Sequence, residues 1–473
     1  YTFDTMVLGA YPGIGKKVPR AINGVQLLRN SARLYATKVE DRFGNWVRYD
    51  WAGGRLNRIY ANDGREITLN YATDDGRLLT AVAHGRTWTY QYTAGNLALS
   101  AVVNPDGSAW QYATSGAMGG IGLLNRVNYH TGSPAPMEWP VYCAGMSTIM
   151  ATSPTYSITH PSGAKAEFTF EPVRHGRTNV PYQCMPGDDP ESSADDYNNY
   201  SLLHDVMSLR SKRVSGPGLI TATTGYAYES LDAGYRPKDA VTDQLTGATP
   251  PPHYKYVTVT EPDGTLVVST FGKDYGLNEG QLLQVDVRKG GITYKTTVNS
   301  YVAQSEVAAL PFPDTVGDSL VAFSDDFNSA VMRPLRSTTI TMTQEESSFT
   351  TTNNSFDAQA RTLSVTQASS LGYVRKQSTA YYDNLSRWVL GQTQRVEQTA
   401  PTSLVMQETV FDTAKDLPWK VYSNGLLQQT IAYNTDGTVA AVTDARNNTT
   451  TLSNWKRGLP QSIQFADTTG KSA

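Results

Sequence analysis

The six histidines are the side chains of this 473-residue chain best suited to metal binding or acid–base chemistry. Two histidines at H-x-x-x-H spacing would place both rings on one face of a helix, as zinc sites often do. The histidines here are scattered instead, so they predict neither a metal centre nor a catalytic base. They stand at His84, His130, His160, His175, His204 and His253.

Two short segments match catalytic motifs only in part. Residues 145–149, GMSTI, contain the first half of a G-x-S-x-G nucleophile elbow but lack the final glycine. Residues 9–17, GAYPGIGKK, resemble a phosphate-binding loop, but Ala10 occupies a required glycine position and Lys17 that of the magnesium-binding Ser or Thr. We therefore expect a packed or turn serine in the first segment and a Pro-Gly loop in the second.

Carboxylates and thiols are present without the spacing of a metal site. The acidic residues between positions 188 and 196 lack the fixed Asp-x-Asp-x-Asp-Gly spacing of a calcium loop, so we expect a solvated loop there. Cys143 and Cys184 have no second pair of thiol ligands, which excludes a Cys-based zinc site. One disulfide or two thiols remain as alternatives. We predict no metal, no cofactor and no catalytic centre in this chain.

Composition and charge narrow the class of protein. Lysine and arginine number 40 and aspartate and glutamate 43, so the formal net charge is −3, and no long run of one sign occurs. A nucleic-acid-binding protein usually has a broad basic surface, so nucleic acid is not an expected partner. No apolar run approaches the roughly 20 residues that a membrane-spanning helix needs. Because the chain begins at Tyr1 and not at Met, we expect it to be part of a longer polypeptide.

The elements that position these residues are predicted to be strands and turns. Only 18% of the residues are charged, while tyrosines number 28 and glycines 39, a mixture that favours strands. Between residues 39 and 112, successive apolar-aromatic runs end in a tyrosine at a period of about twenty-one residues, at Tyr49, Tyr71, Tyr92 and Tyr112. Within the runs apolar and polar residues alternate, which predicts strands with one apolar face.

Asp-Gly pairs separate the predicted strands. Asp75-Gly76 and Asp106-Gly107 lie between such runs, and Asp263-Gly264 and Asp436-Gly437 follow the same pattern later in the chain. Asp-Gly is favoured in tight hairpins because both residues tolerate positive φ. We therefore expect successive strands to pair antiparallel, and strand twist to coil the long sheet into a solenoid, a barrel or a wrapped shell.

The repeats divide the chain into four parts. We assign residues 1–38 to an N-terminal lead-in, 39–115 to clear repeats, 116–252 to an irregular, loop-rich insertion with sheet elements, and 253–473 to degenerate repeats. The best helical candidate is about Tyr200 to Arg210, where leucines and a valine could form one apolar face, although a strand is an equal alternative.

The repeat units resemble the YD repeats of the Rhs (rearrangement hotspot) family. Tyr49-Asp50-x-x-Gly53-Gly54-Arg55 and Tyr433-x-x-Asp436-Gly437 show the pattern most clearly. Several copies occur at the period of the family, over residues 39–112 and 433–465. The repeat positions are Tyr49, Asp50, Gly54, Arg55, Tyr71, Asp75, Gly76, Arg77, Tyr92, Asp106, Gly107, Tyr112, Asp263, Gly264, Tyr433, Asp436 and Gly437.

The resemblance implies an all-β fold, a long antiparallel sheet that spirals into a hollow shell, as in Rhs proteins, insecticidal toxin complexes and teneurins. It implies a secreted or cell-surface bacterial protein whose partners are a toxin cargo or the remainder of the same polypeptide, together with secretion machinery or cell-surface glycans. The closing core of the family, with its self-cleavage site, has no counterpart by Ala473. Neither toxin nor protease activity is therefore carried over.

Three functions follow from these observations. The leading hypothesis is a structural shell segment that encapsulates or presents a polymorphic toxin, with residues that act by packing. The second is an adhesin-like module whose exposed aromatic residues bind glycans or another cell's surface. The third is a polysaccharide-acting enzyme, since the 43 acidic residues could include a glycosidase pair whose separation in space the sequence does not give.

Overall fold

The computed structural model describes residues 1–16, 25–41, 44–95, 98–115, 152–180, 184–185, 197–198, 203–234, 236, 252–316, 330–456 and 458–466. Among the described residues, strands make up 65% and helices 3%. One antiparallel sheet contains 27 of the strands. The prediction of an all-β fold built on a long antiparallel sheet is confirmed.

The strands of this sheet follow the chain in order. The first sixteen are β3 (Lys38–Glu40), β4 (Trp46–Ala52), β5 (Arg55–Ala61), β6 (Glu66–Tyr71), β7 (Leu78–Ala83), β8 (Arg86–Tyr92), β9 (Leu99–Val103), β10 (Ala109–Ser115), β11 (Thr155–Thr159), β12 (Lys165–Gly176), β15 (Leu203–Gly216), β16 (Leu219–Glu229), β17 (Tyr254–Thr260), β18 (Leu266–Gly272), β19 (Leu282–Lys289) and β20 (Ile292–Tyr301). The remaining eleven are β23 (Leu335–Met342), β24 (Ser347–Phe356), β25 (Thr362–Ser369), β26 (Val374–Asn384), β27 (Val389–Ala400), β28 (Leu404–Asp412), β29 (Leu417–Ser423), β30 (Leu426–Tyr433), β31 (Val439–Asp444), β32 (Thr449–Lys456) and β33 (Leu459–Gln464).

Each strand pairs with the next one, and the ladder passes over two intervening stretches. β12 pairs directly with β15, and β20 pairs directly with β23. Within the described residues no pairing joins β33 to β3, so the sheet has two free edges. Three small two-stranded sheets lie outside the ladder. They are β1 (Thr5–Lys16) with β2 (Val25–Tyr35), β13 (Cys184–Met185) with β14 (Tyr197–Asn198), and β21 (Thr315–Val316) with β22 (Ala330–Val331).

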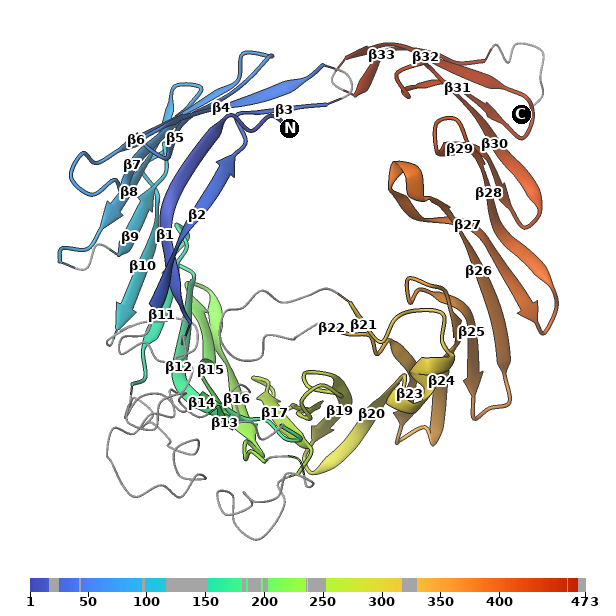
Figure 1. The fold of residues 1–473 in the computed structure, drawn as a ribbon, viewed down its shortest axis with the longest axis horizontal. Helices are drawn as coiled ribbons and strands as arrows, with labels where there is room; N and C mark the ends of the chain where they lie inside the picture. The colour runs from blue at the N-terminus through green and yellow to red at the C-terminus, as the bar shows by residue number, and fades with distance from the viewer. Residues whose placement is uncertain are drawn as a thin grey trace.

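The long sheet curves into a wall. Figure 1 shows the strands following most of a circle, with β33 near β3 and β4 in this view and the β1–β2 hairpin on the inner side. Tyr35 at the end of β2 stacks on Trp51 of β4 with ring centroids 4.3 Å apart. Two short 3-10 helices, η3 (Gln304–Ala309) and η4 (Leu385–Arg387), also lie on the inner side of the strands. Twist accumulated over many antiparallel strands accounts for the curvature.

The wall is one layer of sheet. Its strands alternate between exposed and half-buried residues, as in β4 and β32, instead of burying one face completely. Within the residues that the structure describes, a compact cluster occurs where the stretch after β20 folds onto β24 through Val302, Val307, Phe312 and Phe356. Because few described side chains are fully buried, each strand depends mainly on its two neighbours.

The recurring hairpin loop has five residues with glycine in the fourth position. In residues 104–108 the N–H of Asn104 donates to Ser108 O at 2.7 Å, and the N–H of Gly107 donates to Asn104 O at 3.0 Å. Residues 434–438 and 261–265 repeat this pattern. The glycines at positions 54, 76, 107, 264 and 437 all have φ between +75° and +84°, a region that favours glycine.

The aspartate in front of each glycine has a different function from the predicted one. Asp75, Asp106 and Asp263 are not among the residues with positive φ, so in these loops only the glycine of the pair adopts it. Each carboxylate instead accepts the backbone N–H two residues later, from Arg77, Ser108 and Thr265 at 3.1, 2.9 and 2.9 Å. These bonds, with the Ser108 hydroxyl the largest cause for Asp106, lower the pKa of Asp75 and Asp106.

Two local expectations are corrected. The proposed helix over residues 200–210 is strand β15 from Leu203 onward, because this segment pairs with β12, while the following residues of β15, from Ser211, also pair with β16. The expected Pro-Gly loop over residues 9–17 is mostly strand β1, as far as Lys16. Pro12 and Gly13 fall between the paired positions Tyr11 and Ile14, which fits a residue that cannot donate a ladder hydrogen bond.

Replacing Gly76 by valine tests the requirement for positive φ in these loops. Gly76 has φ +75°, and a Cβ there would also overlap the guanidinium of Arg55. We expect Gly76→Val to lower the free energy of unfolding by about 2 kcal/mol and to promote aggregation, as measured by urea unfolding and light scattering. Thr73→Val, in the same loop at an exposed position, is the matched control. Equal unfolding midpoints for the two variants would contradict the assigned turn.

Candidate functional site

Across the described ranges of the chain, eight hydrogen bonds of one kind join a strand to the part of the chain before it in the ladder. In each bond a tyrosine hydroxyl or a tryptophan indole N–H donates to a main-chain carbonyl 14 to 19 residues earlier, and we call this contact an aromatic clasp. Tyr71 donates to Leu56 O at 2.7 Å and Tyr92 to Leu78 O at 2.7 Å. The remaining donors are Trp51, Tyr228, Tyr301, Tyr381, Tyr433 and Trp455.

A register shift lies next to most of these aromatic rings. The ladder slips immediately before Trp51, Tyr71, Tyr92, Tyr301, Tyr381 and Tyr433. In each case the extra residue belongs to the following strand, as Leu79 of β7 does beside Tyr71, and such a bulge bends the strand that carries it. Burial of the ring raises the pKa of the Tyr71, Tyr92 and Tyr433 hydroxyls.

A basic side chain lies over several of the clasp rings. The guanidinium of Arg77 is 5.0 Å from the centroid of Tyr92, and that of Arg361 is 4.4 Å from Tyr381. Each arginine immediately precedes the residue whose carbonyl accepts the clasp, Leu78 or Thr362. A cation over an aromatic face is attractive. In both cases the arginine that follows the positive-φ residue of the loop, Gly76 or Ala360, lies over the ring of the next clasp.

Some of the repeat positions predicted from the sequence make clasp or loop contacts. Others lie elsewhere in the strands. Tyr49 and Asp50 lie in β4 opposite Ile59 and Arg58, while Trp51 makes the clasp of this hairpin. Tyr112 lies in β10 opposite Ile158. Of the other predicted positions, Arg55 opens β5 and lies against Gly76, and the Asp436 carboxylate accepts the backbone N–H of Thr438 at 2.9 Å.

A second set of polar contacts lies at the ends of β12, β16 and β18, and we call it the rim junction (residues 176–180, 230–236 and 272–279). Arg177 is buried and donates to both carboxylate oxygens of Glu279 at 2.6 and 2.8 Å. The Thr178 hydroxyl donates to Asp274 Oδ1 at 2.5 Å, and His253 Nδ1 lies 2.7 Å from the same oxygen. The Arg177 and Thr178 contacts connect residues 102 and 96 positions apart, and no spacing in the sequence signals them.

Lys273 is the most deeply buried charged residue of the rim junction, with 1% of the residue exposed. Its ammonium donates to Ser230 O and Asp232 O, both at 2.8 Å, and burial lowers its pKa. Gly176 allows the same loop to approach, because a Cβ there would lie 2.3 Å from Leu231 O. Paired and buried polar groups of this kind fix one geometry, so the rim junction holds the ends of the strands together.

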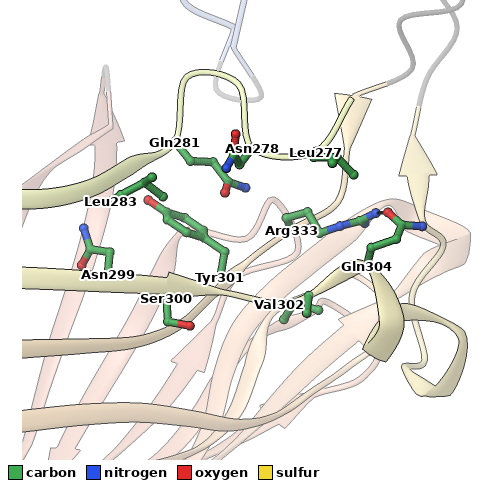
Figure 2. Close-up of a pocket in the computed structure, with 11 residues that line it drawn as sticks. Leu277, Asn278, Gln281, Leu283, Asn299, Ser300, Tyr301, Val302, Gln304 and Arg333 are labelled. Carbon is green, nitrogen blue, oxygen red and sulfur yellow. Dashed lines mark hydrogen bonds between the residues drawn. The ribbon is translucent and has the colours of Figure 1, made fainter. Parts of the chain in front are cut away.

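A polar cavity of about 390 Å³ lies beside the rim junction, between the β18–β19 loop and the end of β20 (Figure 2). Asn278, Tyr301 and Arg333 line it together with aliphatic side chains. The Tyr301 hydroxyl donates to Leu282 O, Asn278 Oδ1 accepts from Asp274 N–H, and Arg333 donates to Asp314 Oδ1 at 2.5 Å. Much of the polar lining is therefore bonded within the protein.

The remaining chemical candidates form no site in the described part of the chain. There, no three His, Cys, Asp or Glu side chains are grouped closely enough to bind a metal ion. His84 and His160 lie in turns and His175 in β12, opposite His204 of β15. His130, Cys143, residues 145–149, Lys17 and most of the acidic stretch lie outside the described residues, as does the side chain of Cys184. No described helix has the length and apolar character needed to cross a membrane.

Removing a clasp hydroxyl tests whether the aromatic clasps stabilise the ladder. We expect Tyr71→Phe to lower the free energy of unfolding by about 1 kcal/mol, because the part-buried Leu56 carbonyl loses its donor. Tyr433→Phe should have a similar effect through Pro418. The control is Tyr373→Phe at an exposed position. Urea midpoints that shift equally in all three variants would show that the clasps do not contribute.

Replacing Lys273 by methionine tests the rim junction. The carbonyls of Ser230 and Asp232 would lose their donor, so we expect the free energy of unfolding to fall by about 1 to 3 kcal/mol. Lys289→Met is the control, since the Lys289–Asp263 pair is exposed and solvent screening leaves such a pair little effect on stability. Differential scanning calorimetry distinguishes the two. A melting temperature for Lys273→Met equal to that of the control would contradict the assignment.

Comparison with known proteins gives only remote similarity. No protein-family model matches the sequence, and no curated protein matches it. The crystal structure of TcdB2-TccC3-Cdc42 aligns at 12% identity and a TM-score of 0.26 over 93% of this chain and 22% of that chain. The crystal structure of TcdB2-TccC3-TEV aligns at 12% identity and a TM-score of 0.16 over 95% and 24%. The chain thus spans less than a quarter of the length of these structures.

Proposed function

We propose that the chain is a wall segment of a secreted or surface-exposed β-shell that encloses or presents another polypeptide, either a toxin cargo or the remainder of the same molecule. The observation that supports this most directly is the shape of the sheet. Twenty-seven strands form one open ladder that curves around most of a circle (Figure 1). A wall of this kind suits enclosure better than a compact two-layer domain does.

The contacts that recur along the wall are structural. The aromatic clasps, the arginines over their rings and the five-residue loops all join one hairpin to the next. A single hairpin cannot bury an apolar face alone, so the stability of each hairpin comes from its contacts with the adjacent hairpins. In this proposal the chain has no catalytic step of its own. The resemblance of its repeats to YD repeats is the second support.

A glycan-binding module is the alternative, and the polar cavity is where it would be expected. Sugar hydroxyls need polar partners that are available for hydrogen bonding. The Tyr301 hydroxyl and the Arg333 guanidinium already bond within the protein. This favours the shell, and we advance neither glycan binding nor polysaccharide hydrolysis as the function of this chain.

Electron microscopy combined with small-angle X-ray scattering tests the proposal. A compact protein of this length has a radius of gyration of about 23 Å, and a curved wall should exceed it clearly. Images of this chain should show a curved wall around a region of low density. Images of the longer polypeptide should show a second polypeptide on the inner side. A filled, compact particle, or additional density on the convex side only, would overturn the proposal.

A further inference from the structure

The loop between β26 and β27 presents a group of apolar side chains to solvent. We call residues 384–390, which include η4, the Trp388 loop. Trp388 is 78% exposed, Leu385 64% and Leu390 39%. Trp388 also has φ +57°, which is rare for a bulky side chain. A large aromatic residue held in an unfavourable backbone conformation and left exposed needs an explanation beyond folding.

The backbone of the Trp388 loop is held in place by polar contacts. Asn384 Oδ1 accepts from the Ser386 hydroxyl at 2.7 Å and from the Arg387 N–H at 3.3 Å. The amide of Asn384 donates to buried Asp416 at 2.9 Å, and Arg387 donates to the same carboxylate at 3.1 Å. The Tyr382 hydroxyl donates to Asp416 at 2.6 Å. The loop is therefore preorganised before any partner binds, which reduces the entropy lost on binding.

These contacts also determine the chemistry of the exposed surface. The side chains of Asn384, Ser386 and Arg387 are engaged in the hydrogen bonds of the loop and with Asp416. The indole of Trp388 and the side chains of Leu385 and Leu390 provide its exposed apolar groups. A partner rich in hydroxyl groups, such as a glycan, would lose hydrogen bonds to water here without replacement. An apolar partner would gain from burial.

The position of the loop favours one kind of apolar partner. Figure 1 shows η4 on the inner side of β26 to β30, facing the middle of the ring of strands. A second copy of the curved wall would meet the convex face or the rims first. A polypeptide held inside the wall would meet the Trp388 loop directly.

We propose that the Trp388 loop is an anchoring surface for an extended, apolar segment of a polypeptide enclosed by the wall. This inference rests on the proposed function and adds a specific contact to it. Exposed tryptophans on fixed backbone commonly dominate the free energy of protein–protein binding. A single anchor of this type would retain an enclosed chain without requiring it to fold.

Binding of an unfolded polypeptide to the purified chain tests the anchor. The probe is fluorescently labelled lactalbumin that has been reduced and carboxymethylated so that it stays unfolded, and the readout is fluorescence anisotropy. We expect Trp388→Ala to raise the Kd at least about tenfold. Leu385→Ser should weaken binding by a smaller factor. Tyr373→Ala is the matched control, since Tyr373 is an aromatic residue with 75% exposure on a hairpin loop. Circular dichroism should confirm that all variants fold.

The possible results distinguish a failure of the proposed anchor from a failure of the proposed shell function. A selective loss of binding in Trp388→Ala supports the anchor. Equal affinity of Trp388→Ala and the unchanged chain, or no binding by either, overturns it, even if microscopy shows an enclosed polypeptide. If the unchanged chain binds a glycan array and Trp388→Ala does not, the partner is a glycan and the anchor is overturned. Images of the longer polypeptide that show a wall with no density on its inner side would instead contradict the proposed function itself.

Discussion

The aromatic clasp is the interaction on which the wall depends most. In a single-layer sheet there is no second layer against which a strand can pack, so contacts between neighbouring hairpins must supply what a core would supply elsewhere. The clasp combines a hydrogen bond to the preceding strand with, at Tyr92 and Tyr381, an arginine over the ring face, and a bulge of the following strand lies beside most of the rings. Repetition of this unit gives the sheet its stability and its curvature.

The rim junction serves the same purpose where the regular repeats are interrupted. The ladder passes from β12 to β15, and no hairpin turn joins these strands. Arg177 and Lys273 connect the ends of β12, β16 and β18 through partners far away in the sequence. The repeated contacts hold consecutive hairpins together. The rim junction, whose ion pairs and hydrogen bonds join residues far apart in the sequence, holds the strand ends beside the insertion.

The periodic pattern of tyrosines and glycines in the sequence predicts much of the fold, because strand ends and turns are set by nearby residues. The spacing of Tyr71, Tyr92 and Tyr433 and the loop glycines predicts the hairpins, because a strand end and a positive φ are local requirements. The strand at residues 203–210 could not be distinguished from a helix, because its pairing with β12 decides it. The rim junction and the Trp388 loop depend on contacts across 29 to 102 residues, for which one sequence contains no signal.

The direct pairing of β12 with β15 and of β20 with β23 also bears on how such a chain can change over time. Since each ladder closes across the intervening stretch, hydrogen bonding in the wall does not depend on how long that stretch is. New sequence can be added at these two places without a shift of register in the strands on either side. Insertions at these two places change the surface of the protein and leave the hydrogen-bonded ladder of the sheet unchanged.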